Sequence, residues 1–79
     1  MERTEIFTKL NEIFTDVLDL EDSPNLTDLT TANDIEEWDS LTHIQLIVAI
    51  EKQFKIKFTS KEILSWQNVG QMVDCIVTK

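Results

Sequence analysis

The sequence predicts an all-helical fold: a small four-helix bundle with three longer helices, one short helix and a long first loop. Three observations support this prediction. Apolar residues recur at the i, i+3, i+4, i+7 spacing of one-sided helices in separate segments. Residues that cap helices stand where those segments begin. The length of 79 residues suits a single domain, residues 1–79, whose core can serve three or four helices.

The first helix is expected from about Thr4 to Leu18. Glu5 falls near its first turn, where the helix dipole favours an acid. The apolar residues on its one buried face are Ile6, Phe7, Leu10, Ile13, Phe14 and Val17.

A long loop follows from Asp19 to Trp38, where helical periodicity is lost and Ser, Asn, Asp and Thr dominate. Pro24 disfavours helical geometry at Ser23. So long a loop in a small domain is usually functional or held down. We expect four apolar residues to hold it against the core: Leu20, Leu26, Leu29 and Ile35.

The second helix should begin at Asp39 or Ser40, either of which can cap it, and end near Phe54. Its apolar residues are Leu41, Ile44, Leu46, Ile47, Val48, Ala49, Ile50 and Phe54. They are too many for one buried stripe against the first helix. The other helices can cover most of them, and the remainder could line a cleft or meet a partner.

The segment from Phe54 to Phe58 alternates apolar and basic residues, which predicts an extended connector with three apolar side chains turned inward. Thr59 and Glu62 then fit a capping box, followed by a short helix through about Trp66. Asn68 and Gln71 form a second candidate box. It opens a last helix whose apolar face is Val69, Met72, Val73, Ile76 and Val77, with Gly70 in the first turn.

Composition narrows the possible functions. The net charge is −8, and between Leu10 and Glu51 there is no Lys or Arg, so a nucleic-acid phosphate backbone would be repelled. No apolar run is long enough to span a bilayer, and the residues after Met1 do not resemble a signal peptide. The single cysteine, Cys75, is expected as a small buried hydrophobe in a reducing, cytoplasmic protein, with neither a disulfide nor a zinc site.

Ser40 and His43 lie three residues apart on a helix, a spacing that suits a nucleophile and its base. A hydrolase is disfavoured, because the chain lacks a glycine-rich turn for an oxyanion hole and has little room for a pocket. His43 is instead expected to pack near Trp38 as a partly exposed residue. The acidic loop lacks the ligand spacing of a calcium-binding loop, so neither a metal site nor a catalytic residue is expected. Ser40 is therefore either a cap or an attachment point.

The chain resembles the acyl carrier protein family over nearly its whole length. The resemblance includes the apolar first helix, the acidic loop with its Leu anchors, and Asp39-Ser40-Leu41 opening the second helix. The segment from Phe54 to Phe58 resembles the family's helix-ending phenylalanine and connector. In an acidic, four-helix chain of this length, the Asp-Ser-Leu triplet at a helix start is a strong signal.

By that resemblance, Ser40 would carry 4′-phosphopantetheine, added by a phosphopantetheinyl transferase, and the arm's thiol would hold an acyl group as a thioester. Asp39 and Leu41 would flank the attachment point, and His43 could contact it. The resemblance implies a monomeric carrier, not an enzyme, that shuttles acyl groups in fatty-acid, polyketide or related metabolism. Acyl-transferring or acyl-activating enzymes would use their own basic patches to dock on this chain. The residues that they would contact are Glu36, Glu37, Asp39, Leu41, Ile44, Gln45 and Glu51.

Some residues depart from the family pattern. The second helix offers few acids on its exposed side, Lys55 stands where the family often has a helix-ending glycine, and Lys57 makes the connector basic. These departures suit a specialised, free-standing carrier. Two alternatives remain open: a D-alanyl or aminoacyl carrier, and a helical docking module that never carries an arm.

Overall fold

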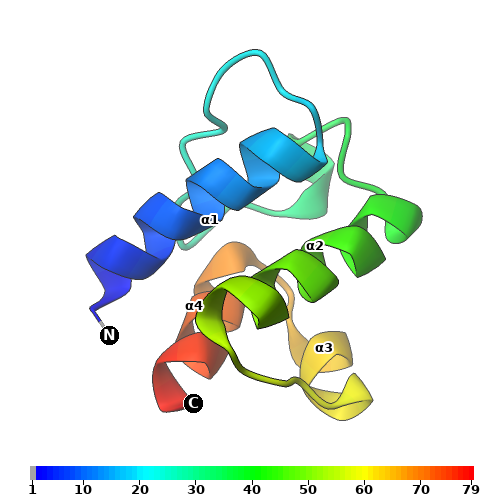
Figure 1. The fold of residues 1–79 in the computed structure, drawn as a ribbon. Helices are drawn as coiled ribbons and strands as arrows, with labels where there is room; N and C mark the ends of the chain where they lie inside the picture. The colour runs from blue at the N-terminus through cyan, green and yellow to red at the C-terminus, as the bar shows by residue number, and fades with distance from the viewer. Residues whose placement is uncertain (1) are drawn as a thin grey trace.

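A computed structural model describes residues 2–79, which fold into four α-helices with no β-strand among these residues (Figure 1). The predicted all-helical bundle is confirmed, and the helices begin and end within one residue of the expected positions. They are α1 Arg3–Val17, α2 Ser40–Phe54, α3 Ser60–Ser65 and α4 Val69–Thr78. The long loop holds one short 3-10 helix that the sequence did not predict, η1 Ala32–Asp34. Across residues 2–79, no helix combines the length and apolar character needed to cross a bilayer.

The core lies where α1, α2 and α4 meet. Each of these helices buries one face and leaves the other in solvent, as the apolar spacing predicted. Eight side chains from the three helices are fully buried: Ile6, Leu10, Phe14, Leu46, Ile50, Val69, Met72 and Val73. The six-residue α3 contributes no fully buried side chain and packs at the side of the bundle.

The long loop is held against the bundle, as expected, although one of its four predicted anchors is wrong. Leu26 is buried, and Leu20 and Ile35 pack partly buried against the core. Leu29, by contrast, is 80% exposed. It lies at the tip of a turn closed by the backbone bond from Thr30 N–H to the Thr27 carbonyl (3.2 Å), and the turn directs its side chain outward.

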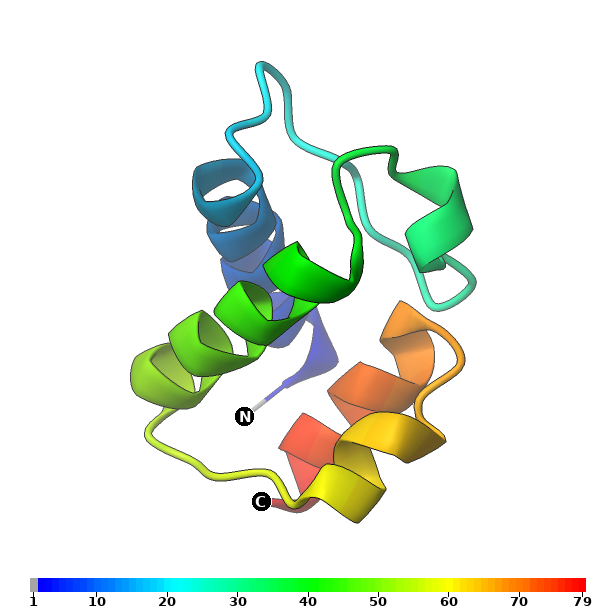
Figure 2. The same cartoon turned by 90° about the vertical axis from the view of Figure 1, so that its right-hand side faces the viewer.

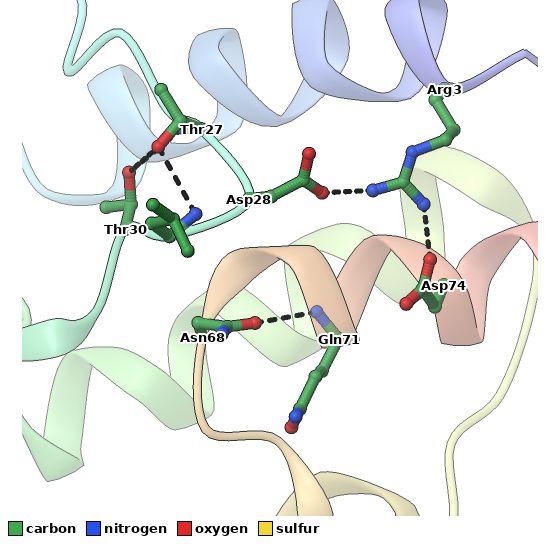
Figure 3. A network of polar contacts seen from close by, with 8 residues as sticks. Arg3, Thr27, Asp28, Thr30, Asn68, Gln71 and Asp74 are labelled. Carbon is green, nitrogen blue, oxygen red and sulfur yellow. Dashed lines mark hydrogen bonds and ion pairs between the residues drawn. The ribbon is translucent and has the colours of Figure 1, made fainter.

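The long loop lies beside the start of α4 (Figure 2), and polar contacts join the two parts, of which Figure 3 shows the ion pairs of Arg3. The backbone N–H groups of Val69 and Gly70 donate to the carbonyls of Thr30 (2.8 Å) and Asp28 (3.0 Å). Arg3, at the start of α1, forms ion pairs with both Asp28 and Asp74. The long loop lies so close to α4 that a Cβ on Gly70 would lie 2.7 Å from the Asp28 carbonyl oxygen. A glycine is required here by packing, which its place in the first turn of a helix did not reveal.

The connector after α2 is shorter than expected, because Phe54 still belongs to α2, and residues 56–59 form neither helix nor strand. Lys55 ends the helix in the left-handed conformation (φ 57°, ψ 47°) that usually favours glycine. Phe54, Ile56 and Phe58 all pack partly buried against the core. The Phe58 backbone N–H donates to the Glu51 carboxylate at 2.8 Å, which ties the connector back to the helix.

The capping box that opens α3 is confirmed, since Thr59 and Glu62 exchange hydrogen bonds of 2.9 and 3.1 Å. The second predicted box is only half formed. Asn68 accepts from the Gln71 backbone N–H at 2.9 Å, but the Gln71 side chain accepts from Gln67 N–H rather than reaching Asn68.

Cys75 is not the buried hydrophobe that the sequence predicted. It is half-buried, because α3 lies over the flank of α4 and brings the Glu62 carboxylate to 3.4 Å from its Sγ. Burial and this carboxylate raise the pKa of the Cys75 thiol, so the thiol stays protonated at neutral pH.

Candidate functional site

Asp39 caps α2. Its Oδ1 accepts from the backbone N–H groups of Leu41 (3.0 Å) and Thr42 (2.9 Å), and Thr42 Oγ1 accepts from the Asp39 N–H at 2.8 Å. The bond from the Thr42 backbone is the main reason why the pKa of Asp39 is lowered from its usual value. The sequence left Asp39 and Ser40 as alternative caps, and the structure resolves this in favour of Asp39.

Ser40 consequently occupies the first helical position with its hydroxyl outside the cap. The cap's hydrogen bonds are made by Asp39 and Thr42, and the Ser40 side chain is exposed. The amide dipoles of the fifteen-residue α2 place partial positive charge at this end of the helix. A negatively charged ester on Ser40 Oγ would lie in a favourable field and within reach of solvent.

His43 packs against Trp38, as expected. The indole Nε1–H donates to His43 Nδ1 at 3.0 Å, and the two rings stack with 24° between their planes. Trp38 itself is buried and packs edge-on against Phe14, with ring centroids 4.9 Å apart. Partial burial lowers the pKa of His43, so the ring is neutral at pH 7. The indole thus connects the start of α2 to the core.

A cavity of about 350 Å³ opens beside Ser40. Its walls come from three parts of the chain: η1, the start of α2, and the junction between α3 and α4. They are formed by Ala32, Trp38, Asp39, Ser40, His43, Trp66, Gln67, Asn68 and Met72. Six of these residues were missed as site residues from the sequence, namely Ala32, Trp38, Trp66, Gln67, Asn68 and Met72. Trp38 lies two residues before Ser40, whereas only tertiary packing brings the other five to the serine, and no local motif marks them.

The outward face of α2 beside Ser40 is apolar. Leu41, Ile44 and Val48 are 67%, 64% and 50% exposed, and Gln45 is exposed near them. Val48 was not among the docking residues expected from the sequence, although it continues the same helical stripe as Leu41 and Ile44. Glu36 and Glu37 are exposed in the turn before the helix, so they lie close to the same end. Glu51 lies apart from this group, near the far end of α2, with its carboxylate engaged by the connector.

The geometry gives no support to a hydrolase. Ser40 and His43 both line the cavity, but the indole of Trp38 occupies His43 Nδ1. While Nδ1 accepts from Trp38, the neutral ring carries its proton on Nε2, so neither nitrogen can accept the proton of a serine hydroxyl.

Comparison with known proteins places these features in a family. A family model described as "Phosphopantetheine attachment site" matches residues 8–76. The acyl carrier protein of Guillardia theta is 34% identical over 79 residues, covering 100% of this chain and 96% of that protein. A solution NMR structure of holo acyl carrier protein from Geobacter metallireducens superposes with a TM-score of 0.85 at 45% identity. The superposition covers 92% of this chain and 83% of the Geobacter metallireducens chain.

The match thus covers nearly every described element, from α1 to α4, and includes the segment that opens α2. The resemblance seen in the sequence is confirmed by both the family model and the fold. The chain belongs to the acyl carrier protein family, whose cofactor is a covalently attached 4′-phosphopantetheine.

Proposed function

We propose that Ser40 Oγ is the attachment atom, and that the protein is a carrier, not an enzyme, that holds acyl groups as thioesters and passes them between partner enzymes. The observation that supports this proposal most directly is that two adjacent residues have different roles at the start of α2. Asp39 makes the cap, so the adjacent Ser40 hydroxyl is exposed and not required for the helix. Fatty-acid, polyketide or related acyl metabolism would supply the cargo.

The surroundings of Ser40 fit a phosphodiester and its arm. The helix dipole favours the negative charge, and the cavity beside the hydroxyl offers a wall of Trp38, His43 and Met72. The phosphopantetheine group would supply the thiol that carries the acyl group. The residues of this chain would only hold the arm and shield part of it from water.

Loading must rely on another protein for proton transfer. When the phosphodiester forms, Ser40 Oγ attacks the pyrophosphate of coenzyme A, adenosine 3′,5′-bisphosphate leaves, and the hydroxyl proton has to pass to a base. His43 Nδ1 accepts from the Trp38 indole at 3.0 Å, and the backbone N–H groups that bond to Asp39 lower the pKa of its carboxyl group, which makes the carboxylate a weaker base. A phosphopantetheinyl transferase that brings its own base is therefore the natural first partner.

The partner surface would combine charge and apolar contact next to Ser40. Glu36, Glu37 and Asp39 form an acidic edge that would attract basic patches, and Leu41, Ile44 and Gln45 supply contact area. Glu51 contributes less than the sequence suggested, because its carboxylate holds the connector. A cytoplasmic location remains a prediction that rests on one unpaired thiol, Cys75.

Intact-mass measurement tests the attachment atom. The protein is incubated with coenzyme A and a broad-specificity phosphopantetheinyl transferase, and a mass gain of one phosphopantetheinyl group is expected. Ser40→Ala should show no gain. Ser60→Ala is a matched control, because Ser60 is exposed at the first position of α3 in the same relation to its cap, Thr59. An equal gain on Ser40→Ala, or none on the wild type, would refute the proposal.

A further inference from the structure

The outward face of α2 changes chemistry along its length. The exposed apolar residues Leu41, Ile44 and Val48 are followed on the same stripe by Lys52 and Lys55, at helical spacings of three and four residues. Lys57, in the connector, is also exposed. The face is therefore acidic before Ser40, apolar in its middle and basic at its far end. In Figure 1 this basic end lies across the molecule from the start of α2.

The basic end is hollowed. A shallow hollow of about 500 Å³ is lined by Val48, Glu51, Lys52, Lys55, Ile56 and Lys57. Val48 and Ile56 provide apolar surface, and the three lysines surround it. Three lysines against one glutamate leave an excess of two positive charges in a chain whose net charge is −8.

These charges are not neutralised by the rest of the protein. The ion pairs within residues 2–79 are made by Arg3 and Lys79, and none involves the lysines of the hollow. The carboxylate of Glu51 accepts from the Phe58 backbone N–H, which holds it at the base of the connector. The hollow thus presents ammonium groups around an apolar floor, a combination that recognises a carboxylate next to an apolar side chain.

We propose that this hollow, formed by Val48, Lys52, Lys55, Ile56 and Lys57, is a second docking site for an acidic segment of a partner protein that also inserts one apolar side chain. An extended polyanion is a poorer occupant, since the protein's fifteen acidic residues would repel it outside this small patch. A short acidic segment needs only the patch itself.

The hollow also has a defined relation to Ser40. Lys55 is fifteen residues further along the chain, which at 1.5 Å per helical residue places the two about 22 Å apart along the axis of α2. A partner with a basic patch for the acidic edge beside Ser40 and an acidic patch for the hollow can lie along α2 in only one direction. The hollow would therefore select partners with an acidic patch about 20 Å from their basic one.

The site can be tested with a defined peptide by NMR titration of the ¹⁵N-labelled full chain. The probe is acetyl-Glu-Glu-Phe-Glu-Glu-amide, with two controls in which Phe becomes Ser or the acids become Lys. Saturable shifts are expected at the amides of Val48, Lys52, Ile56 and Lys57. The Phe-to-Ser peptide should bind severalfold more weakly, and the basic peptide should not shift these amides.

Charge reversal provides the matched comparison. Lys52→Glu/Lys57→Glu should weaken binding about tenfold, because two surface attractions become repulsions. Lys9→Glu/Lys61→Glu makes the same change in net charge at lysines outside the hollow, and should weaken binding less than about threefold. Amide shifts of α2 in the free variants establish that the helix is intact. The titration is repeated on Ser40→Ala, so the result is independent of whether Ser40 carries the arm.

Four results would overturn the inference: no saturable shift, shifts confined to residues outside the hollow, equal loss in both double variants, or an unchanged affinity for the Phe-to-Ser peptide. The peptide is also compared with phosphatidylglycerol vesicles and with single-stranded DNA. If either binds the same lysines more tightly than the peptide does, the occupant of the hollow is another polyanion and not an acidic protein segment. Concentration-dependent shifts of these amides without peptide would make a second copy of this chain the occupant.

Discussion

The Trp38 indole N–H donates to His43 Nδ1 across 3.0 Å, and both residues line the cavity beside Ser40. This bond exists only while Nδ1 is unprotonated, so it belongs to the neutral form of His43. Burial of the ring acts in the same direction and lowers the pKa of His43 from 6.5. The folded state therefore favours neutral His43 more than the unfolded state does.

This relationship predicts a loss of stability in mild acid. As the pH falls below about 6.5, the unfolded chain binds a proton at residue 43 before the folded chain does, so the free energy of unfolding decreases. The decrease ends once the pH is below the folded pKa. Denaturant unfolding of the wild type between pH 7.5 and pH 5, above the range where carboxylates titrate, should show it. His43→Gln keeps an acceptor for the indole but cannot titrate, and a wild-type slope in this variant would contradict the assignment to His43.

A second prediction separates the cap from the attachment point. Asp39→Ala should lower Tm by about 4–8 °C, because it removes the acceptor of two backbone N–H groups in the first turn. Asp39→Asn, which keeps a capping oxygen, should remain close to the wild type. Ser40→Ala should change the free energy of unfolding by less than about 0.5 kcal/mol, since its hydroxyl lies outside the cap. Thermal melts by circular dichroism are sufficient, and a larger effect of Ser40→Ala than of Asp39→Ala would reverse the two roles.

Lys55 provides a third prediction. A side chain in the left-handed conformation costs free energy that glycine avoids, although glycine also gains entropy in the unfolded chain. The balance should make Lys55→Gly about 0.5–1 kcal/mol more stable to denaturant than the wild type. Lys52→Gly, inside the same helix, should be less stable by about 1 kcal/mol. Destabilisation by both substitutions would argue against a left-handed residue 55.

Gly70 provides a fourth prediction. A methyl group at this position would lie 2.7 Å from the Asp28 carbonyl oxygen and 2.9 Å from its carboxylate. Gly70→Ala should therefore destabilise the protein by about 1–3 kcal/mol, although alanine is the better helix former. Asp28→Ala cannot rescue this variant, because the nearest obstructing atom is in the backbone. Denaturant unfolding of the two single variants and the double variant measures the change in the free energy of unfolding. A stabilised Gly70→Ala would show that the loop moves aside freely.

The sequence predicted what depends on local pattern. Helical periodicity gave α1, α2 and α4, because each of these amphipathic helices buries a stripe whose spacing is visible in the chain, and a capping box gave α3. The contact between Trp38 and His43 was also predictable, since five residues across a helix start bring the two rings together. Asp39 and Ser40 could not be ranked as caps, because both residue types cap helices equally well.

The predictions that failed depend on the geometry of a turn or on how distant segments meet. Leu29 looked like an anchor by its spacing, but a turn between Thr27 and Thr30 directs it to solvent. The cavity walls at Ala32, Trp66 and Met72 come from segments that no sequence motif connects. The need for Gly70 arises from the Asp28 backbone, which is 42 residues away in the chain.

The last prediction concerns the speed of partner association. Glu36 and Glu37 are exposed just before Ser40, where their charge should attract the basic patch of a phosphopantetheinyl transferase. Glu36→Lys/Glu37→Lys should lower the association rate constant severalfold at about 0.05 M salt. At about 0.5 M salt the difference should shrink, because the screening length falls to a few ångströms. Stopped-flow fluorescence with an active transferase measures both rates.

The matched control for this rate is Glu2→Lys/Glu5→Lys. It makes the same change in net charge near the start of α1, which lies on the far side of the molecule from the start of α2 (Figure 1). Local steering requires the control to retain most of the wild-type rate at low salt. If both variants slow association equally, the net charge of the whole chain governs the encounter. If neither does, charge plays no part in it, and the apolar residues Leu41 and Ile44 remain as the basis of recognition.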